Sequence, residues 1–310
     1  MARRLLLLIN SLEGGGAEKV FVSLAGHLAA TKGWKLCIAT LDDAPTAYQP
    51  PPSIERVRLD CRGSFLRSIL PVRHLINQWR PDVVLSFLTR ANCAVVLGRQ
   101  RGKFRCIISE RIHTTSHLGQ DARGRVIQAM VRRLYPRADV VIAVSTGVAE
   151  ELKRNYGVSA DRIITIPNPV SAEALRARGN QNPAIELPTD FFVAIGRLVP
   201  NKGFDMLLRA FAEQANKKRA LVILGEGPER ENLTAMVEAL GLTTRVLMPG
   251  YVENPQAIVA RAHAYVSASR SEGFPNALVE AMSLNRAVIS TDCHSGPAEI
   301  LADSATGTVK

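Results

Sequence analysis

The sequence predicts an α/β protein of two domains, each built on a parallel β-sheet that helices cover. Short runs of β-branched and aliphatic residues alternate along the chain with amphipathic segments, as in a parallel sheet with helical crossovers. A length of 310 residues suits two domains of about 150 residues each. Pro167 and Pro169 end regular structure near the middle of the chain, and the composition beyond them is polar.

The first domain is expected to comprise residues 1–178 and to hold seven strands. Their ranges are 4–10, 35–41, 56–59, 82–87, 105–109, 140–145 and 162–166. Residues 179–188 are expected to form the linker. The second domain, residues 189–310, is expected to open with a strand at Phe191, and further strands are expected at 220–225, 245–248, 264–269 and 287–291.

Composition narrows the class of protein. No apolar run reaches the ~20 residues that span a bilayer. Residues 1–10 resemble the start of a signal peptide, but Glu13 follows and no small-residue cleavage site does, so a first buried strand is favoured. The cysteines are odd in number, scattered and without a C-x-x-C pair, which indicates reduced thiols in a cytosolic protein: Cys37, Cys61, Cys93, Cys106 and Cys293.

Positive charge is concentrated in the first half. Residues 62–137 hold 15 Lys and Arg against 3 Asp and Glu, whereas residues 181–310 hold 12 against 14. Such a local surplus of positive charge indicates an anionic partner surface or an anionic substrate. The alternative is that these arginines only solvate helix surfaces. The basic amphipathic segments 65–79 and 123–137 could lie at a membrane interface or cover a sheet. Within the first of them, Pro71 is expected to break or restart the helix.

Two carboxylates follow the strand predicted at 264–269. Glu272 is expected in a loop that turns at Gly273, and Glu280 on the helix that Pro275 begins. The carboxyl end of a parallel strand is where open α/β sheets bind ligands. A loop glutamate and a helix-surface glutamate without a function are the alternative.

Two other segments suit a phosphate group. Arg197 offers a planar fork of donors and Lys202 a compact charge, both after the strand that begins at Phe191, and together they suit a diphosphate. Two solvated cations are the alternative. Three glycines at 14–16 precede a predicted helix, so the backbone there can approach an anion closely. They match neither the Walker nor the G-x-G-x-x-G pattern, so a plain turn remains possible.

In order and spacing these motifs resemble those of the retaining, nucleotide-sugar-dependent glycosyltransferases of family four. The resemblance extends over residues 14–301 and implies the GT-B fold, with two Rossmann-like domains whose parallel sheets face an interdomain cleft. It implies that Arg197 and Lys202 bind the donor diphosphate, that Glu272 contacts donor-sugar hydroxyls and that Glu280 holds the ribose.

The same resemblance assigns the other donor contacts. Gly15 and Gly16 would line the cleft opposite the diphosphate, and the backbone of Tyr251 and Val252 would lie against the base. His113, in the polar loop 109–117, would lie near the donor sugar, unless it is a loop histidine without a special role. Gly273 and Phe274, next to Glu272, complete the donor site.

The activity that the resemblance implies is transfer of a hexose or N-acetylhexosamine, with retention, from a nucleotide diphospho-sugar, expected to be a UDP-sugar. The acceptor would be a glycan or a polyprenyl-diphosphate-linked oligosaccharide of bacterial surface polysaccharide or glycan biosynthesis. Catalysis would rest on Glu272, His113, Arg197 and Lys202, mainly through neutralisation of the leaving diphosphate. The sequence has no D-x-D triplet, so neither a metal nor a cofactor is expected.

The expected location is cytoplasmic, at an anionic membrane surface on the inner face of the plasma membrane, and no nucleic-acid partner is expected. Two alternatives remain: a GT-B sugar-nucleotide epimerase, and a non-catalytic, truncated relative that binds nucleotide or membrane. Members of the family continue after the segment that matches 296–301 with another strand and final helices. Since residues 303–310 supply neither, we expect a second sheet without that edge strand and without the helix that braces the first domain.

Overall fold

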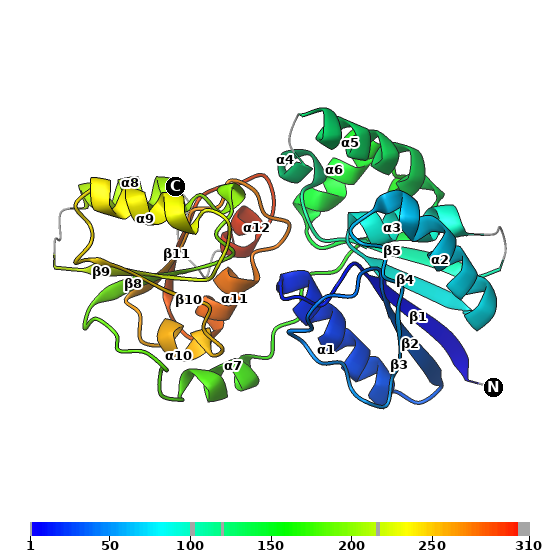
Figure 1. Ribbon diagram of the computed structural model, residues 1–310, viewed down its shortest axis with the longest axis horizontal. Helices are drawn as coiled ribbons and strands as arrows, with labels where there is room; N and C mark the ends of the chain where they lie inside the picture. Colours follow the sequence, from blue (N-terminus) through cyan, green and yellow to red (C-terminus); the bar gives the residue numbers. More distant parts are fainter. Residues whose placement is uncertain (1, 100–102, 119–120, 215–217, 303–310) are drawn as a thin grey trace. The chain divides into compact units, whose positions relative to one another are not determined.

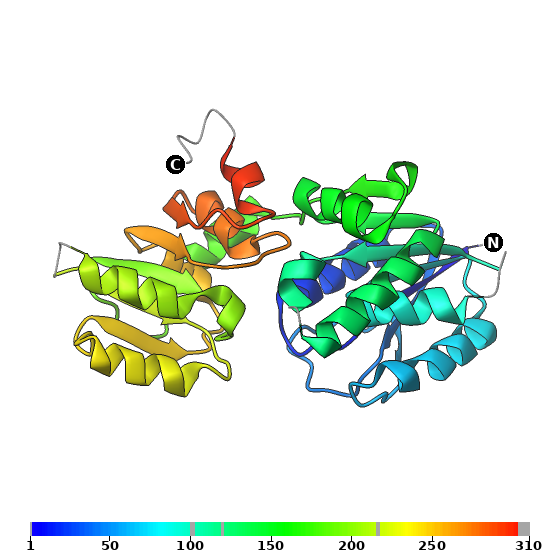
Figure 2. The same ribbon diagram turned by 90° about the horizontal axis from the view of Figure 1, so that it is seen from above.

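The computed structural model describes residues 2–99, 103–118, 121–214 and 218–302. The chain divides into two compact units, Met1–Asn168 and Pro169–Lys310 (Figure 1). Each unit is a parallel β-sheet with helices packed on both of its faces, as the view in Figure 2 also shows. The predicted class, two parallel-sheet α/β domains, is confirmed.

The first unit holds a seven-stranded sheet in the order β3-β2-β1-β4-β5-β6-β7. All seven predicted strands are present: β1 (Arg3–Ile9), β2 (Trp34–Thr40), β3 (Glu55–Arg58), β4 (Val83–Phe87), β5 (Arg105–Glu110), β6 (Val140–Ala143) and β7 (Ile163–Thr165). Strand order reverses between β1 and β4, and such switch points of parallel sheets leave a crevice outside the strand ends. The carboxyl ends of these two strands therefore mark the functional edge of the sheet.

Helices cover this sheet: α1 (Gly16–Ala30), α2 (Phe65–Trp79), α3 (Thr89–Gly98), α4 (Thr114–Leu118), α5 (Ala122–Leu134) and α6 (Thr146–Tyr156), with short 3-10 turns η1 (Tyr135–Arg137) and η2 (Ala160–Arg162). β1 is apolar and buried from Leu5 to Ile9, as expected of a strand covered on both faces. Pro71 lies inside α2 and does not break it. That expectation was wrong, because the buried face of α2, with Val72, Ile76 and Trp79, outweighs one lost hydrogen bond.

The second unit holds a five-stranded sheet in the order β10-β9-β8-β11-β12. Its strands are the five predicted ones: β8 (Phe191–Ile195), β9 (Ala220–Leu224), β10 (Val246–Gly250), β11 (Ala264–Ser267) and β12 (Ala287–Ser290). Its helices are α7 (Ala172–Gly179), α8 (Phe204–Glu213), α9 (Arg230–Ala239), α10 (Pro255–Val259), α11 (Asn276–Ser283) and α12 (Pro297–Leu301), with the 3-10 turn η3 (Pro200–Lys202).

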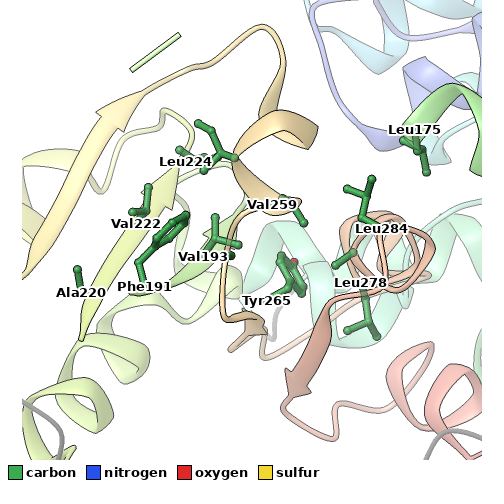
Figure 3. Close-up of a cluster of buried hydrophobic side chains, with 13 residues drawn as sticks. Leu175, Phe191, Val193, Ala220, Val222, Leu224, Val259, Tyr265, Leu278 and Leu284 are labelled. Atoms are coloured by element: carbon green, nitrogen blue, oxygen red, sulfur yellow. The ribbon is translucent and has the colours of Figure 1, made fainter. Parts of the chain in front are cut away.

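A buried apolar cluster joins sheet and helices in the second unit (Figure 3). Phe191 and Val193 of β8 and Tyr265 of β11 pack there with Leu278 and Leu284 from the region of α11. Because this cluster holds α11 against the sheet, it also holds in place the polar residues in the loop before α11 and those on α11 itself.

The division between the units falls at Asn168–Pro169, whereas the sequence placed the boundary after residue 178 and the linker at 179–188. The helix α7 packs against α10 and α11 of the second unit. A Cβ on Gly179 would lie 2.8 Å from Leu284 Cδ2 and 3.2 Å from Ala260 Cβ, so a larger residue there would require Leu284 to shift. The segment 179–188 thus follows a helix that already belongs to the second unit.

The second sheet was expected to lack an edge strand and a bracing helix because residues 303–310 supply neither. These residues lie outside the described residues. Of the helices in the described ranges, none is long and apolar enough to cross a membrane. All five cysteines lie in the described ranges, and each is buried and free.

Candidate functional site

Three of the predicted residues gather at the carboxyl edge of the second sheet. Arg197 follows β8, Lys202 ends η3, and Glu272 follows β11, the neighbour of β8 in the sheet. The strands are parallel, so the loops after them emerge at the same edge. A backbone hydrogen bond of 2.8 Å from the Arg270 N–H to the Asn201 oxygen joins two of these loops.

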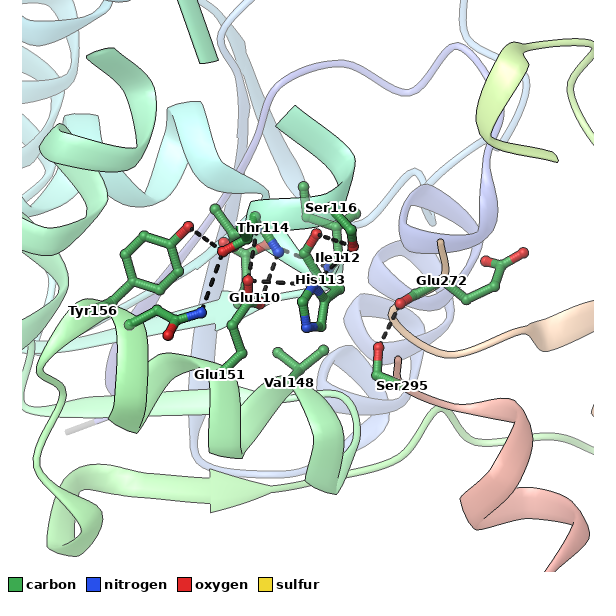
Figure 4. Close-up of polar contacts among 12 residues, drawn as sticks. Glu110, Ile112, His113, Thr114, Ser116, Val148, Glu151, Tyr156, Glu272 and Ser295 are labelled. Carbon is green, nitrogen blue, oxygen red and sulfur yellow. Dashed lines mark hydrogen bonds and ion pairs between the residues drawn. The ribbon is translucent and has the colours of Figure 1, made fainter. Parts of the chain in front are cut away.

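Lys202 and Glu272 form an ion pair, with 2.6 Å between Nζ and Oε1, and their side chains are only 26% and 12% exposed. Ser269 Oγ also donates to Glu272 Oε1, at 2.7 Å. Ser295 Oγ donates to the backbone oxygen of Glu272 at 2.5 Å (Figure 4). The position of Glu272 is therefore fixed at both its backbone and its carboxylate.

Glycine at position 203 brings Lys202 to Glu272. Gly203 has a φ of +64°, and a Cβ there would lie 2.0 Å from the carbonyl oxygen of Ala268. No residue with a side chain fits this approach. The 3-10 turn that ends in Lys202 therefore rests directly on the backbone that leads to Glu272.

An ion pair that the sequence did not indicate braces the same loops. Arg270 binds Asp205 through both guanidinium nitrogens, at 2.8 and 2.7 Å, and NH1 also donates to the Pro200 oxygen at 2.7 Å. The hydrogen bond from Arg270 lowers the pKa of Asp205 below its usual value. Arg270 is thus occupied by the protein, whereas the guanidinium of Arg197 is exposed to solvent.

Glu280 lies on α11, and Gln256 of α10 donates to its Oε2 from Nε2 at 2.9 Å. Gln256 is buried, and its own Oε1 finds no hydrogen-bond partner among the described residues. Sequence reasoning missed Gln256, because nothing in its local pattern separates a buried glutamine from a surface one. It holds the carboxylate of Glu280 in place.

The other predicted residues of this unit lie at the same edge. Tyr251 follows β10 and is exposed, and the next residue, Val252, packs against the apolar cluster of Figure 3. Gly273 is buried and Phe274 half-buried, and both lie between Glu272 and α11. The edge therefore carries two cations, two carboxylates and an exposed aromatic ring.

The remaining predicted residues, Gly15, Gly16 and His113, belong to the first unit. Gly15 is the N-cap of α1 and Gly16 its first residue, at the end of the loop that follows β1. Gly14 before them has a φ of +123°, which favours glycine. His113 lies between β5 and α4, and its Nδ1 is 2.8 Å from Ser116 Oγ (Figure 4).

Two buried carboxylates hold the loop of His113, and the sequence assigned neither a role. Glu110 Oε1 accepts the Arg111 N–H at 2.9 Å, and Oε2 accepts the hydroxyl of Tyr135. Burial raises the pKa of Glu110 to about 7. The second carboxylate, Glu151 of α6, lies 3.3 Å from Nδ1 of His113 through Oε1.

A metal centre of protein side chains is not formed in the ranges that the structure describes, where no three His, Cys, Asp or Glu residues are grouped to hold an ion. The polar residues at the edge of the second sheet instead combine a partly buried Lys–Glu pair, an exposed arginine and a second glutamate on a helix. Such a set can bind a ligand that carries both phosphate and hydroxyl groups.

Two family models match the chain. The model described as Glycosyltransferase Family 4 matches residues 14–174, and that described as Glycosyl transferases group 1 matches residues 178–310. Together they cover both units.

Curated relatives match over nearly the whole chain. The N-acetylgalactosamine-N,N'-diacetylbacillosaminyl-diphospho-undecaprenol 4-alpha-N-acetylgalactosaminyltransferase of Campylobacter jejuni is 28% identical, over 98% of this chain and 85% of its own length. The lipopolysaccharide core biosynthesis glycosyltransferase LpsE of Rhizobium meliloti is 24% identical, over 94% of this chain and 80% of its own.

Solved structures share the fold. The lipopolysaccharide outer core galactosyltransferase WaaB in its apo form has a TM-score of 0.68 at 24% identity, over 96% of this chain and 82% of that one. The Anabaena protein Alr3699/HepE in complex with UDP and glucose has a TM-score of 0.74 at 18% identity, over 96% and 83%.

Proposed function

The chain belongs to Glycosyltransferase Family 4 and has the GT-B fold, and from this premise we propose that it transfers a sugar with retention from a UDP-sugar to a lipid-linked glycan. The transferred group is a hexose or an N-acetylhexosamine. The reaction belongs to bacterial surface polysaccharide or glycan biosynthesis.

The juxtaposition of Lys202 and Glu272, 2.6 Å apart at the carboxyl edge of the second sheet, carries the donor assignment. A diphosphate that leaves with negative charge needs fixed cations, and Lys202 and Arg197 supply them. The sugar next to that diphosphate needs an acceptor for its hydroxyls, which the Glu272 carboxylate supplies. One ligand that has both groups, a sugar diphosphate, suits both ends of this pair.

The other roles follow the positions of the residues. Glu280, held by Gln256, accepts the ribose hydroxyls, and the backbone of Tyr251 and Val252 lies against the base. Gly273 and Phe274 adjoin the sugar. From the first unit, His113 acts near the sugar, and Gly15 and Gly16 allow backbone N–H groups to approach the diphosphate. In this proposal the two cations, and no metal or cofactor, carry the leaving charge.

The acceptor is proposed to be a glycan on a polyprenyl diphosphate. The Campylobacter relative is named for a diphospho-undecaprenol acceptor. The first unit carries the local excess of arginine at 62–137, and α2 exposes Leu66 and Leu70 beside Arg67 and Arg73. An exposed helix face of this kind suits the anionic inner face of a plasma membrane, where such an acceptor is anchored.

Incubation with radiolabelled UDP-sugars, with and without a lipid extract that contains polyprenyl-diphosphate glycans, tests the proposal. Lipid-dependent transfer of label is the expected result, and the anomeric coupling in the product, measured by NMR, reports retention. Release of UDP and an altered sugar without any acceptor would establish an epimerase instead. Binding of UDP without turnover of any donor would identify a non-catalytic relative.

A further inference from the structure

The carboxylate of Glu151 is buried at the start of α4. Glu151 is 4% exposed, and its carboxylate accepts hydrogen bonds from two consecutive backbone N–H groups. Thr114 donates to Oε2 at 2.8 Å and Thr115 to Oε1 at 2.6 Å (Figure 4). Both donors belong to the first turn of α4, and helix N-termini favour negative charge. Glu151 comes from a different helix, α6, and thus fixes the loop before α4 from outside.

The same carboxylate faces His113. Oε1 of Glu151 lies 3.3 Å from Nδ1 of the ring, and Ser116 Oγ lies 2.8 Å from that nitrogen. Ser116 also donates to the backbone oxygen of His113 at 3.3 Å. Two side chains, those of Glu151 and Ser116, thus fix the place of one imidazole.

A carboxylate accepts hydrogen bonds and never donates them while it is ionised. The nitrogen of His113 that faces Glu151 is therefore the one that carries hydrogen, and the proton of the neutral ring resides on Nδ1 rather than on Nε2. The single hydroxyl hydrogen of Ser116 goes either to the His113 backbone oxygen, so that Oγ accepts from Nδ1–H, or to an unprotonated Nδ1, so Ser116 is compatible with either form. Of these two side chains, the ionised Glu151 is the one that accepts only and thus favours the Nδ1–H form.

Capping of α4 does not by itself require a buried carboxylate. Ser, Thr or Asn satisfies helix N–H groups without the cost of removing a charge from water. The loop already has a second support in Glu110, whose Oε1 accepts the Arg111 N–H. The additional effect of a charge at position 151 is exerted on the imidazole.

We propose that Glu151 is a positioning residue for His113: it orients the ring and holds it in the tautomer protonated at Nδ1. Its effect on turnover rests on the proposed function, in which His113 acts near the donor sugar. The tautomer itself does not depend on any activity.

NMR of the full chain labelled with ¹⁵N-histidine tests the tautomer directly. His113→Gln identifies the signals of this ring among the six histidines. The parent should show a protonated Nδ1. Glu151→Gln must place its NH2 group where an oxygen accepted a backbone N–H, and only at the Oε1 position does this group find an acceptor, Nδ1, so the ring should change to the Nε2–H form. Glu150→Gln, the same substitution at the neighbouring exposed residue that pairs with Lys153, should leave the signals unchanged.

An Nε2–H ring in the parent, or the same tautomer in Glu151→Gln, would overturn the proposal. If Glu151→Gln does not fold, Ser116→Ala decides, because it removes the other contact at Nδ1 and keeps Glu151. If that variant keeps the Nδ1–H form, Glu151 is supported as the residue that determines the tautomer. If it loses the Nδ1–H form, Ser116 determines the tautomer and the proposal is rejected.

A double-mutant cycle tests the link to turnover separately. Glu151→Gln should lower kcat roughly threefold to a hundredfold in the parent, the range of coupling between contacting residues, with little change in KM for the donor. In a His113→Ala background the same substitution should have no further effect. Additive losses would mean that Glu151 acts without His113. If the tautomer responds as expected but no variant or parent transfers sugar, the proposed function fails while the tautomer assignment stands.

Discussion

Nζ of Lys202 lies 2.6 Å from Oε1 of Glu272, so the cation assigned to the diphosphate and the carboxylate assigned to the sugar neutralise each other. A diphosphate that binds Lys202 must compete with this contact. Glu272 keeps a second hydrogen bond from Ser269 Oγ at 2.7 Å, so its carboxylate remains anchored when the lysine turns to another anion. Substitutions of Lys202 and of Glu272 are therefore expected to differ in their effects on UDP affinity and on turnover of the donor.

Lys202→Met should weaken UDP binding about tenfold or more, because charge-assisted hydrogen bonds contribute about 1.5 to 3 kcal/mol each. Arg197→Ala should do the same. Isothermal titration calorimetry with UDP measures both. Lys153→Met is the matched control, since it removes a lysine from another Lys–Glu pair, of 2.7 Å, on the exposed side of α6. Unchanged affinity in both site variants would remove the diphosphate assignment.

Glu272→Gln should leave UDP affinity unchanged or increase it, because the substitution releases Lys202 from its partner. Turnover of the intact UDP-sugar should fall at least tenfold, since the sugar loses its charged acceptor. Calorimetry with UDP and steady-state kinetics with the donor give the two numbers. A variant that loses UDP affinity and keeps its turnover would reverse the assigned role.

Glu280→Gln should weaken UDP binding about tenfold and abolish discrimination of the ribose hydroxyls. The parent should bind UDP more tightly than 2′,3′-dideoxy-UDP, and the variant should bind the two alike. The hydrogen bond from Gln256 can persist in the variant, because the new amide keeps an oxygen. Glu231→Gln, at an exposed position of α9, is the control. Equal discrimination in variant and parent would contradict the ribose role.

The sequence predicted the fold well because its signals are local. Most strands contain a short aliphatic run, and burial on both faces makes such runs nearly continuous, as in β1, whereas the edge strand β3 is charged and exposed. Residues 197, 202, 272 and 280 could be predicted as a site because parallel strands bring the loops after them to one edge. The resemblance to a family supplied their roles, which stay predictions.

The sequence could not predict the residues that hold the site in place. The pairing of Arg270 with Asp205 joins positions far apart in the chain. No local pattern marks Glu151, which is buried beneath the loop of His113. The division at Asn168–Pro169 also depends on distant contacts, because α7 packs on α10 and α11, which follow it by many residues.

The pH dependence of stability should report Glu110. Burial raises the pKa of this carboxyl to about 7 from the ordinary 4.5. Between these pH values Glu110 holds a proton in the folded chain that it has released in the unfolded chain. The contribution of this proton to the free energy of unfolding is therefore full below pH 4.5 and is lost as pH rises through 7. The loss is on the order of 3 kcal/mol.

Glu110→Gln should therefore lose less unfolding free energy than the parent between pH 5 and 8. Urea unfolding at several pH values measures the difference. Glu150→Gln should follow the parent, because the hydrogen bond from Lys153 lowers the pKa of Glu150 below 4.5, outside this window. Parallel curves for parent and Glu110→Gln would show that the carboxyl is ionised when buried.

Membrane binding should depend on one face of α2. Leu66 is 75% and Leu70 72% exposed, and Arg67 and Arg73 are exposed beside them. Residues four and seven positions apart share a helix face, so Leu66, Leu70 and Arg73 form one stripe. Each arginine near an anionic bilayer contributes about 1 kcal/mol, and this attraction fades within a Debye length of about 8 Å. Each leucine contributes about 1.5 to 3 kcal/mol if lipid buries it fully.

The parent should thus co-sediment with vesicles of phosphatidylglycerol and phosphatidylethanolamine, and less so as salt increases. Replacing Leu66 and Leu70 together by Ser should weaken binding at least tenfold at every salt concentration, since apolar contact is not screened. Replacing Arg67 and Arg73 by Gln should weaken binding mainly at low salt. Leu247→Ser, at an exposed leucine of the second unit, is the control. If binding does not depend on lipid charge, or if all these variants still bind, the arginines only solvate helix surfaces. That outcome would favour a soluble acceptor.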